Sequence, residues 1–157
     1  MFHRLTVFVL TVLVFSAAAW AQQDPFNGTW KQNIAKSKYN PGPPPSSPSV
    51  TKIEAAPGGA VKVTTDGVDA QGSKTHTEYT AKYDGKDYPY AGSPDWDTVA
   101  VRRIDTNTRL TVNKKNGSVT RMILSVVSPD GKTRTNTSIS INARGQAAHN
   151  ETIWDKQ

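Results

Sequence analysis

Turn signals recur at short intervals along most of this chain, and they restrict it to an architecture of short antiparallel strands. The glycine dipeptides are Gly58-Gly59, Asp66-Gly67, Asp84-Gly85, Asn116-Gly117, Asp130-Gly131 and Arg144-Gly145. Asn-Gly and Asp-Gly supply the positive φ angles that tight hairpin turns require. Since a chain interrupted this often has no room for long helices, the pattern favours an all-β fold.

The segments between these turns are rich in Val, Ile, Thr and Tyr and alternate with a period of two, as strands do. We predict strands at about 50–56, 60–66, 75–84, 97–104, 108–114, 118–128, 133–142 and 147–155, with a further one from Thr29 to Gln32. No stretch of the mature chain has a helical stripe, although 33–39 has room for one helical turn. An antiparallel meander of eight to ten strands hides its edges by closing into a barrel.

The first residues have the pattern of a secretory signal peptide. Arg4 precedes an apolar run from Leu5 to Phe15, and Ala19-Trp20-Ala21 is an A-x-A cleavage site. The apolar run is shorter than the roughly 20 residues of a membrane span. We therefore expect export to the periplasm or the extracellular space.

The rest of the chain divides by composition. Residues 22–48 hold Phe26-Asn27-Gly28-Thr29-Trp30 and a proline-rich connection, 41–48, whose prolines exclude a helix or a central strand. Residues 49–157 hold the barrel strands and form one domain with 26–48.

Charge and composition exclude several classes of function. The formal net charge is +6, but basic and acidic residues are interspersed, without the basic helix or basic-aromatic motif of a nucleic-acid-binding protein. The chain has no cysteine, which excludes thiol catalysis and thiolate metal sites. It has no phosphate loop and no Gly-x-Gly-x-x-Gly motif. We expect no cofactor, no nucleic acid and no stable membrane insertion.

Alternation along the strands also indicates which side chains line the barrel. Expected inward rows are Thr77, Tyr79, Ala81 and Tyr83; Leu110 and Val112; Met122, Leu124 and Val126, opposite Val119, Arg121 and Ile123; and Ile139 and Ile141 with Thr133, Thr135 and Thr137. Such a lining mixes aliphatic, aromatic and hydroxyl groups. It is consistent with a partly wet cavity, but we favour the simpler interpretation that threonine serves only as a good strand residue.

The segment Phe26-Asn27-Gly28-Thr29-Trp30-Lys31 resembles the start of the calycin barrels, the lipocalins and fatty-acid-binding proteins, in which a Gly-x-Trp tryptophan closes the base. The final strand, 151–156, is similar in pattern to the last strand of the fatty-acid-binding proteins. With segments such as 82–89 and 128–133, the whole resembles secreted bacterial lipocalin-like proteins. The resemblance implies a calycin-like barrel and the binding of a small apolar or amphipathic molecule.

The chain departs from this family where fatty acids bind. Where the fatty-acid-binding proteins carry an Arg and a Tyr on the last strand, this chain has Thr152 and Trp154, and the two lid helices have no counterpart. Arg103 is the only basic residue that the alternation leaves as an inward candidate. We therefore expect neutral apolar molecules to bind more tightly than fatty acids of equal length.

The expected ligand contacts are aromatic. They are Tyr79, Tyr83, Tyr88, Tyr90, Trp96 and Trp154, with the barrel entrance near Tyr88, Tyr90 and Trp96. This reading makes the protein a non-catalytic binder of unidentified ligand and unknown oligomeric state.

Two alternatives stay open. One is an envelope structural or interaction module whose barrel is filled by its own side chains. The other is a carbohydrate-handling enzyme that uses Asp95 and Asp97, with Trp96 stacking on a sugar. His76 and His149 need a third ligand, Glu78 or Glu151, to hold a metal, and we expect no metal site.

The signal-peptide pattern yields a first prediction. Cleavage after Ala21 gives a mature protein that begins at Gln22, because signal peptidase accepts only small side chains at its two pocket positions. Intact-mass and N-terminal peptide analysis of exported protein checks this. An exported chain that still begins at Met1 would contradict it.

Overall fold

The chain folds into a single closed barrel of antiparallel strands. The computed structural model describes residues 24–69, 72–141 and 145–157, so the predicted signal peptide and its cleavage site lie outside the described residues. The strands are β1 (Gly28–Asn40), β2 (Val50–Ala56), β3 (Ala60–Val68), β4 (Lys74–Lys82), β5 (Asp84–Ala91), β6 (Thr98–Arg103), β7 (Thr108–Lys115), β8 (Ser118–Val127), β9 (Thr133–Ile141) and β10 (Ala147–Lys156).

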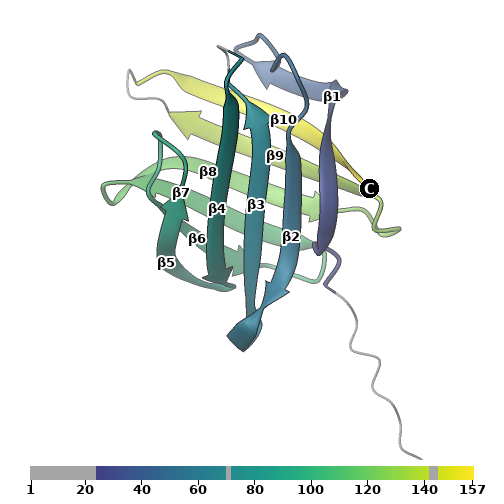
Figure 1. Cartoon of the computed structure of the whole chain (residues 1–157), viewed down its shortest axis with the longest axis vertical. Helices are drawn as coiled ribbons and strands as arrows, with labels where there is room; N and C mark the ends of the chain where they lie inside the picture. Colours follow the sequence, from purple (N-terminus) through teal and green to yellow (C-terminus); the bar gives the residue numbers. More distant parts are fainter. Residues whose placement is uncertain (1–23, 70–71, 142–144) are drawn as a thin grey trace, which may run out of the picture.

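Each strand pairs with its neighbours in sequence, and the first strand closes the ring. The order around the barrel is β1-β10-β9-β8-β7-β6-β5-β4-β3-β2. Figure 1 shows the yellow β10 lying between β9 and the purple β1. Strand β1 pairs with β2 over Gly28–Lys31 and with β10 from Trp30 to Asn40, with a register shift between Asn33 and Lys38. Because every strand has two partners, the sheet has no open edge.

The all-β fold class, with a closed antiparallel barrel of calycin type, is confirmed. Two local expectations were wrong. Strand β5 was missed, because Asp84-Gly85 was assigned to a turn and Pro89 argues against a strand, yet β5 pairs with β6 through Tyr88 and Val99. Residues 33–39 form no helical turn but continue β1, held to β10 by the Ser37 hydroxyl, which accepts a hydrogen bond of 2.9 Å from the Ile153 N–H.

Helix contributes almost nothing to the described part of the chain. It consists there of one 3-10 turn, Pro57–Gly59, between β2 and β3. None of the helical structure described is long and apolar enough to cross a membrane.

One end of the barrel is closed by the residues that precede β1. Phe26 and Trp30 are fully buried there among Ile53, Val61, Ala81, Val101 and Val127. The Trp30 indole N–H donates a hydrogen bond of 2.8 Å to the Phe26 carbonyl, which fixes the entry into β1. We call this apolar end the floor of the barrel.

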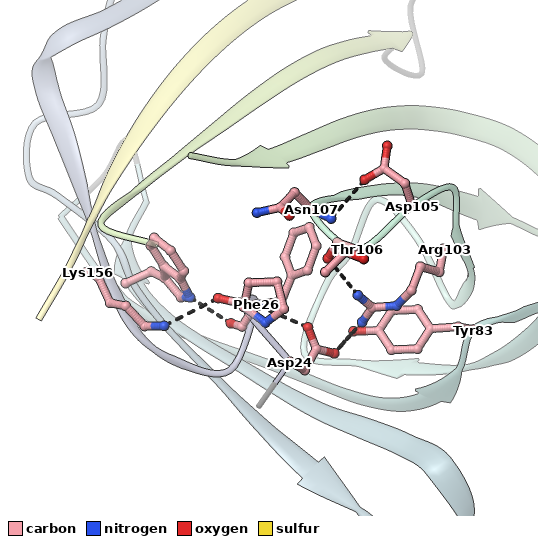
Figure 2. Close-up of polar contacts among 10 residues, drawn as sticks. Asp24, Phe26, Tyr83, Arg103, Asp105, Thr106, Asn107 and Lys156 are labelled. Carbon is pink, nitrogen blue, oxygen red and sulfur yellow. Dashed lines mark hydrogen bonds and ion pairs between the residues drawn. The ribbon is translucent and has the colours of Figure 1, made fainter. Parts of the chain in front are cut away.

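Polar contacts tie the N-terminal segment across the floor (Figure 2). Asp24 forms an ion pair with Arg103, and its other oxygen accepts a hydrogen bond of 3.0 Å from the Phe26 N–H. The Tyr83 hydroxyl donates to Asp24 at 3.0 Å, and the Arg103 guanidinium lies 4.1 Å from the centre of the Tyr83 ring. These contacts join the segment before β1, the β4–β5 turn and β6 at the floor.

The inward rows expected on β8 and β9 were wrong, because the opposite face of each strand points inward. Met122, Leu124, Val126, Ile139 and Ile141 are exposed on the outside. Ser125, Val127, Arg134 and Ser138 are buried in their place. The rule that apolar rows face the interior fails here because the interior is largely polar.

Trp30 yields a prediction on stability. Removing a fully buried indole leaves a large cavity in the floor, so Trp30→Ala is expected to lower the free energy of unfolding by about 3–5 kcal/mol. Urea denaturation followed by circular dichroism measures the change. The matched control is Trp30→Phe, which keeps most of the apolar volume at the same position. A loss below about 1 kcal/mol for Trp30→Ala would show that the floor does not depend on this residue.

Candidate functional site: a cationic cavity inside the barrel

The barrel encloses a cavity of about 300 Å³ above the floor. Its lining is mostly polar. Hydroxyl and amide groups come from Gln32, Ser49, Thr51, Thr65, Thr75, Thr77, Thr111, Asn113, Ser125 and Asn136; aromatic rings from Tyr79, Tyr90, Trp96 and Trp154; aliphatic groups from Val63 and Ile123; and guanidinium groups from Arg109, Arg121 and Arg134. The barrel is therefore hollow, and the threonines of its strands line the hollow.

The meander fixes which end of the cavity each residue occupies. The floor holds the segment before β1 together with the β2–β3 and β6–β7 turns, and the opposite end holds the β1–β2 and β5–β6 connections. Trp96, in the β5–β6 connection, lies at that opposite end, where it meets Tyr90 edge to face at 5.8 Å. The proline-rich residues 41–48 form the β1–β2 connection at the same end.

Two arginines lie directly on the floor. The Arg109 guanidinium is 4.6 Å from the centre of the Phe26 ring. The Arg134 guanidinium lies 5.1 Å from the Trp30 ring and 4.8 Å from the Trp154 ring. Aromatic faces attract cations, and this attraction holds both side chains in place. Arg109 and Arg134 are only 5% and 2% exposed.

These two arginines lack protein partners for part of their hydrogen-bonding capacity. Among the described residues, Arg109 Nε and Nη1 and Arg134 Nε have no hydrogen-bond partner. The cavity lining described includes no Asp or Glu. Burial lowers the pKa of Arg134 well below its ordinary value, and the positive charge of Arg109 lowers it further. Charge of one sign is thus concentrated at the inner end of the cavity.

A third arginine lies toward the other end. Arg121 is half-buried, and its guanidinium lies 5.6 Å from the centre of the Trp96 ring. Burial lowers its pKa as well. Tyr79, between these regions, has a pKa raised by burial, so its hydroxyl stays neutral and available as a donor.

Four of the six aromatic residues expected at the site line this one cavity: Tyr79, Tyr90, Trp96 and Trp154. The other two do not. Tyr83 lies at the floor and donates to Asp24, and the Tyr88 hydroxyl donates to Asp84 at 2.9 Å outside the lining. Whether the four lining residues contact a ligand stays a prediction.

The expectation that Arg103 is the only basic residue able to point into the barrel was wrong. Arg103 does point inward, but it is taken up by Asp24 and by the Thr106 carbonyl, which it reaches at 3.0 Å. The cavity receives its charge from β7, β8 and β9 instead. A sequence signal for this existed: Arg109, Thr111 and Asn113 form one polar row, and Arg134, Asn136 and Ser138 form another. Both rows were assigned outward because their opposite faces are apolar.

The structure does not group Asp95 with Asp97 in one pocket, nor the histidines with further metal ligands among the described residues. Asp97 accepts a hydrogen bond of 3.0 Å from the Asn116 N–H, while Asp95 lines a separate surface pocket with Trp96, Lys115 and Ile141 that does not include Asp97. His76 is exposed and contacts Asp66 at 2.7 Å. Among the described residues, no three His, Cys, Asp or Glu side chains are grouped to hold a metal ion.

Comparison with known proteins identifies the fold through structure and not through sequence. No family model and no curated protein matches the chain. A solved structure that does match is the zebrafish ileal bile acid-binding protein, crystallised with cholic acid. The TM-score is 0.54 and the identity 16%, over 85% of this chain and 99% of that one. At this identity the match shows a shared calycin-type barrel.

Proposed function

We propose that this protein is an exported, non-catalytic binding protein that holds one small amphipathic molecule inside its barrel. The observation that carries the proposal is the cavity of about 300 Å³. Its volume lies at the lower end of the range usual for small-molecule sites, and its lining offers aromatic faces beside many polar groups, as an amphipathic molecule requires. The fully packed floor beneath it leaves the opposite end as the route of entry.

Other observations agree with this proposal. The zebrafish protein with the same type of barrel holds cholic acid, an amphipathic molecule. The described lining provides hydroxyl, amide, aromatic and guanidinium groups, and no carboxylate or imidazole for general acid–base chemistry. The signal-peptide pattern at 1–21 supports export.

The test is a substitution that places a bulky side chain inside the cavity. Ser125 is buried and lines the cavity, whereas the adjacent Leu124 points outward. Ser125→Phe is expected to weaken the binding of decanol and of decanoate by about tenfold or more, because the ring occupies the space of the ligand. Leu124→Phe, one residue away, is expected to leave both affinities unchanged. Isothermal titration calorimetry measures them. Absence of binding by both amphiphiles to the wild type, or equal binding by both variants, would contradict the proposal.

A second candidate function, an interaction module, is favoured by the outer surface of β8 and β9. The charged residues of these strands, Arg121 and Arg134, both point into the barrel, so the outer faces of the two strands carry no charge. Met122 pairs with Ile139 across them, and Val112 of β7 extends the same row. On the other side of the barrel, outward Lys–Glu pairs such as Lys52–Glu54 and Lys62–Glu78 occupy β2 to β4.

An uncharged sheet face can meet a second copy of itself without burying an unpaired charge. Two strands of this length present a face on the order of 300–500 Å², which is below the roughly 800 Å² per partner of a standard interface. We therefore expect weak self-association. In sedimentation velocity at rising concentration, Ile139→Lys is expected to abolish any dimer, and Thr80→Lys, on the charged side, to leave it unchanged. A strictly monomeric wild type at about millimolar concentration would exclude this second candidate.

A further inference from the structure

Arg109 and Arg134 form a buried pair of like charges at the inner end of the cavity, and no residue described in its lining neutralises them. Removing a charge from water is costly unless the group is paired and hydrogen-bonded. At the floor, Arg103 meets this requirement through Asp24. Arg109 retains unpartnered Nε and Nη1 atoms instead, and Arg134 an unpartnered Nε. The barrel therefore holds one partly exposed arginine with its counter-ion, and two buried arginines without an acidic residue in the described lining.

Neither arginine is free to reach bulk water at the inner end. The floor beneath them is closed by Phe26 and Trp30, which are fully buried. A long side chain near the surface can place its charge in solvent. Arg109 and Arg134 are instead stacked on aromatic rings, and both side chains line the cavity.

We infer that Arg109 and Arg134 bind the anionic head group of an amphipathic ligand, which enters head first and leaves its apolar part against Tyr79, Tyr90 and Trp96. This inference rests on the proposed function and adds the class of ligand and its orientation. Guanidinium groups present donors in a planar fork that matches the two oxygens of a carboxylate. Two buried guanidinium groups in a described lining without Asp or Glu make the site complementary to such a group. The site lies on β7 and β9, while the last strand carries Thr152 and Trp154 where the resemblance placed a clamp.

From the sequence we expected neutral molecules to bind more tightly than fatty acids of equal length, and the inference reverses this preference. Decanoate and decanol have equal chain lengths and differ in the charge of the head group. Charge-assisted hydrogen bonds to two buried arginines are expected to make decanoate bind about tenfold or more tightly than decanol at neutral pH. Arg109→Met keeps an unbranched side chain but removes the guanidinium group and its charge, so this ratio is expected to fall to about one, with the decanol affinity unchanged.

Two further arginine variants serve as controls. Arg121→Met is expected to keep the preference for decanoate, since Arg121 lies at the open end beside Trp96. Arg103→Met is expected to keep it too, but to lower the urea midpoint, because it leaves the partly buried Asp24 without its ion-pair partner. Arg109→Met is expected to leave the urea midpoint of the ligand-free protein equal or raised, since it relieves repulsion between two buried charges.

Each outcome of the calorimetric and urea experiments decides between defined alternatives. Equal binding of decanoate and decanol to the wild type overturns the anion site while cavity binding stands. Absence of binding by both overturns the proposed function itself. Loss of the preference in Arg121→Met and not in Arg109→Met overturns the head-first orientation. A large fall in the midpoint of Arg109→Met with an intact preference for decanoate makes Arg109 a structural residue and overturns its role in binding.

Discussion

Arg134 lies between the indole rings of Trp30 and Trp154, and this contact joins the closure of the barrel to the chemistry of its cavity. Trp30 belongs to the first strand and Trp154 to the last, which pair to close the ring. Trp154 also pairs in register with Arg134 across β9 and β10. The guanidinium therefore packs on the seam where the two ends of the chain meet. Its aromatic contacts offset part of the cost of burying a charge.

The packing of side chains differs between the two ends of the barrel. The floor is a conventional apolar core with Phe26, Trp30, Ile53 and Val101 at its centre. Above it the interior becomes polar, and the apolar side chains of β8 and β9 turn outward. Hydrophobic burial is thus concentrated at one end. At the other end the side chains leave a cavity that carries positive charge. Such a loss of packing is typical of functional sites, where binding is favoured at a cost in stability.

The fold could be predicted from the sequence because its signals are local. Asn116-Gly117 and Asp130-Gly131 mark hairpin turns whatever surrounds them, and the alternation between them gave most strand positions within one or two residues. The N-terminal Gly-Thr-Trp segment correctly placed Trp30 in the buried base. Strand β5 was missed because its local signals, Asp84-Gly85 and Pro89, contradict the pairing that the closed sheet imposes.

The site could be predicted only in part. Tyr79, Tyr90, Trp96 and Trp154, four of the six aromatic residues expected at the site, do line the cavity. The arginines were not predicted there, because alternation fixes which residues share a face but not which face is inside. On β8 the apolar row of Met122 and Leu124 gave the wrong choice. Only the register across β7, β8 and β9, which places Arg109 beside Ser125 and Ser125 beside Asn136, shows that the polar rows share one face of the sheet.

The central claim, that the inner end of the cavity holds an anion, is tested most directly by a crystal structure of the protein with decanoate. The account predicts a single ligand inside the barrel, with its carboxylate oxygens within about 3 Å of the Arg109 and Arg134 guanidinium groups and its alkyl chain directed toward Trp96. A carboxylate bound at Arg121 with the chain directed toward the floor would contradict it. So would decanoate bound on the outer face of β8 and β9 with the cavity free of ligand.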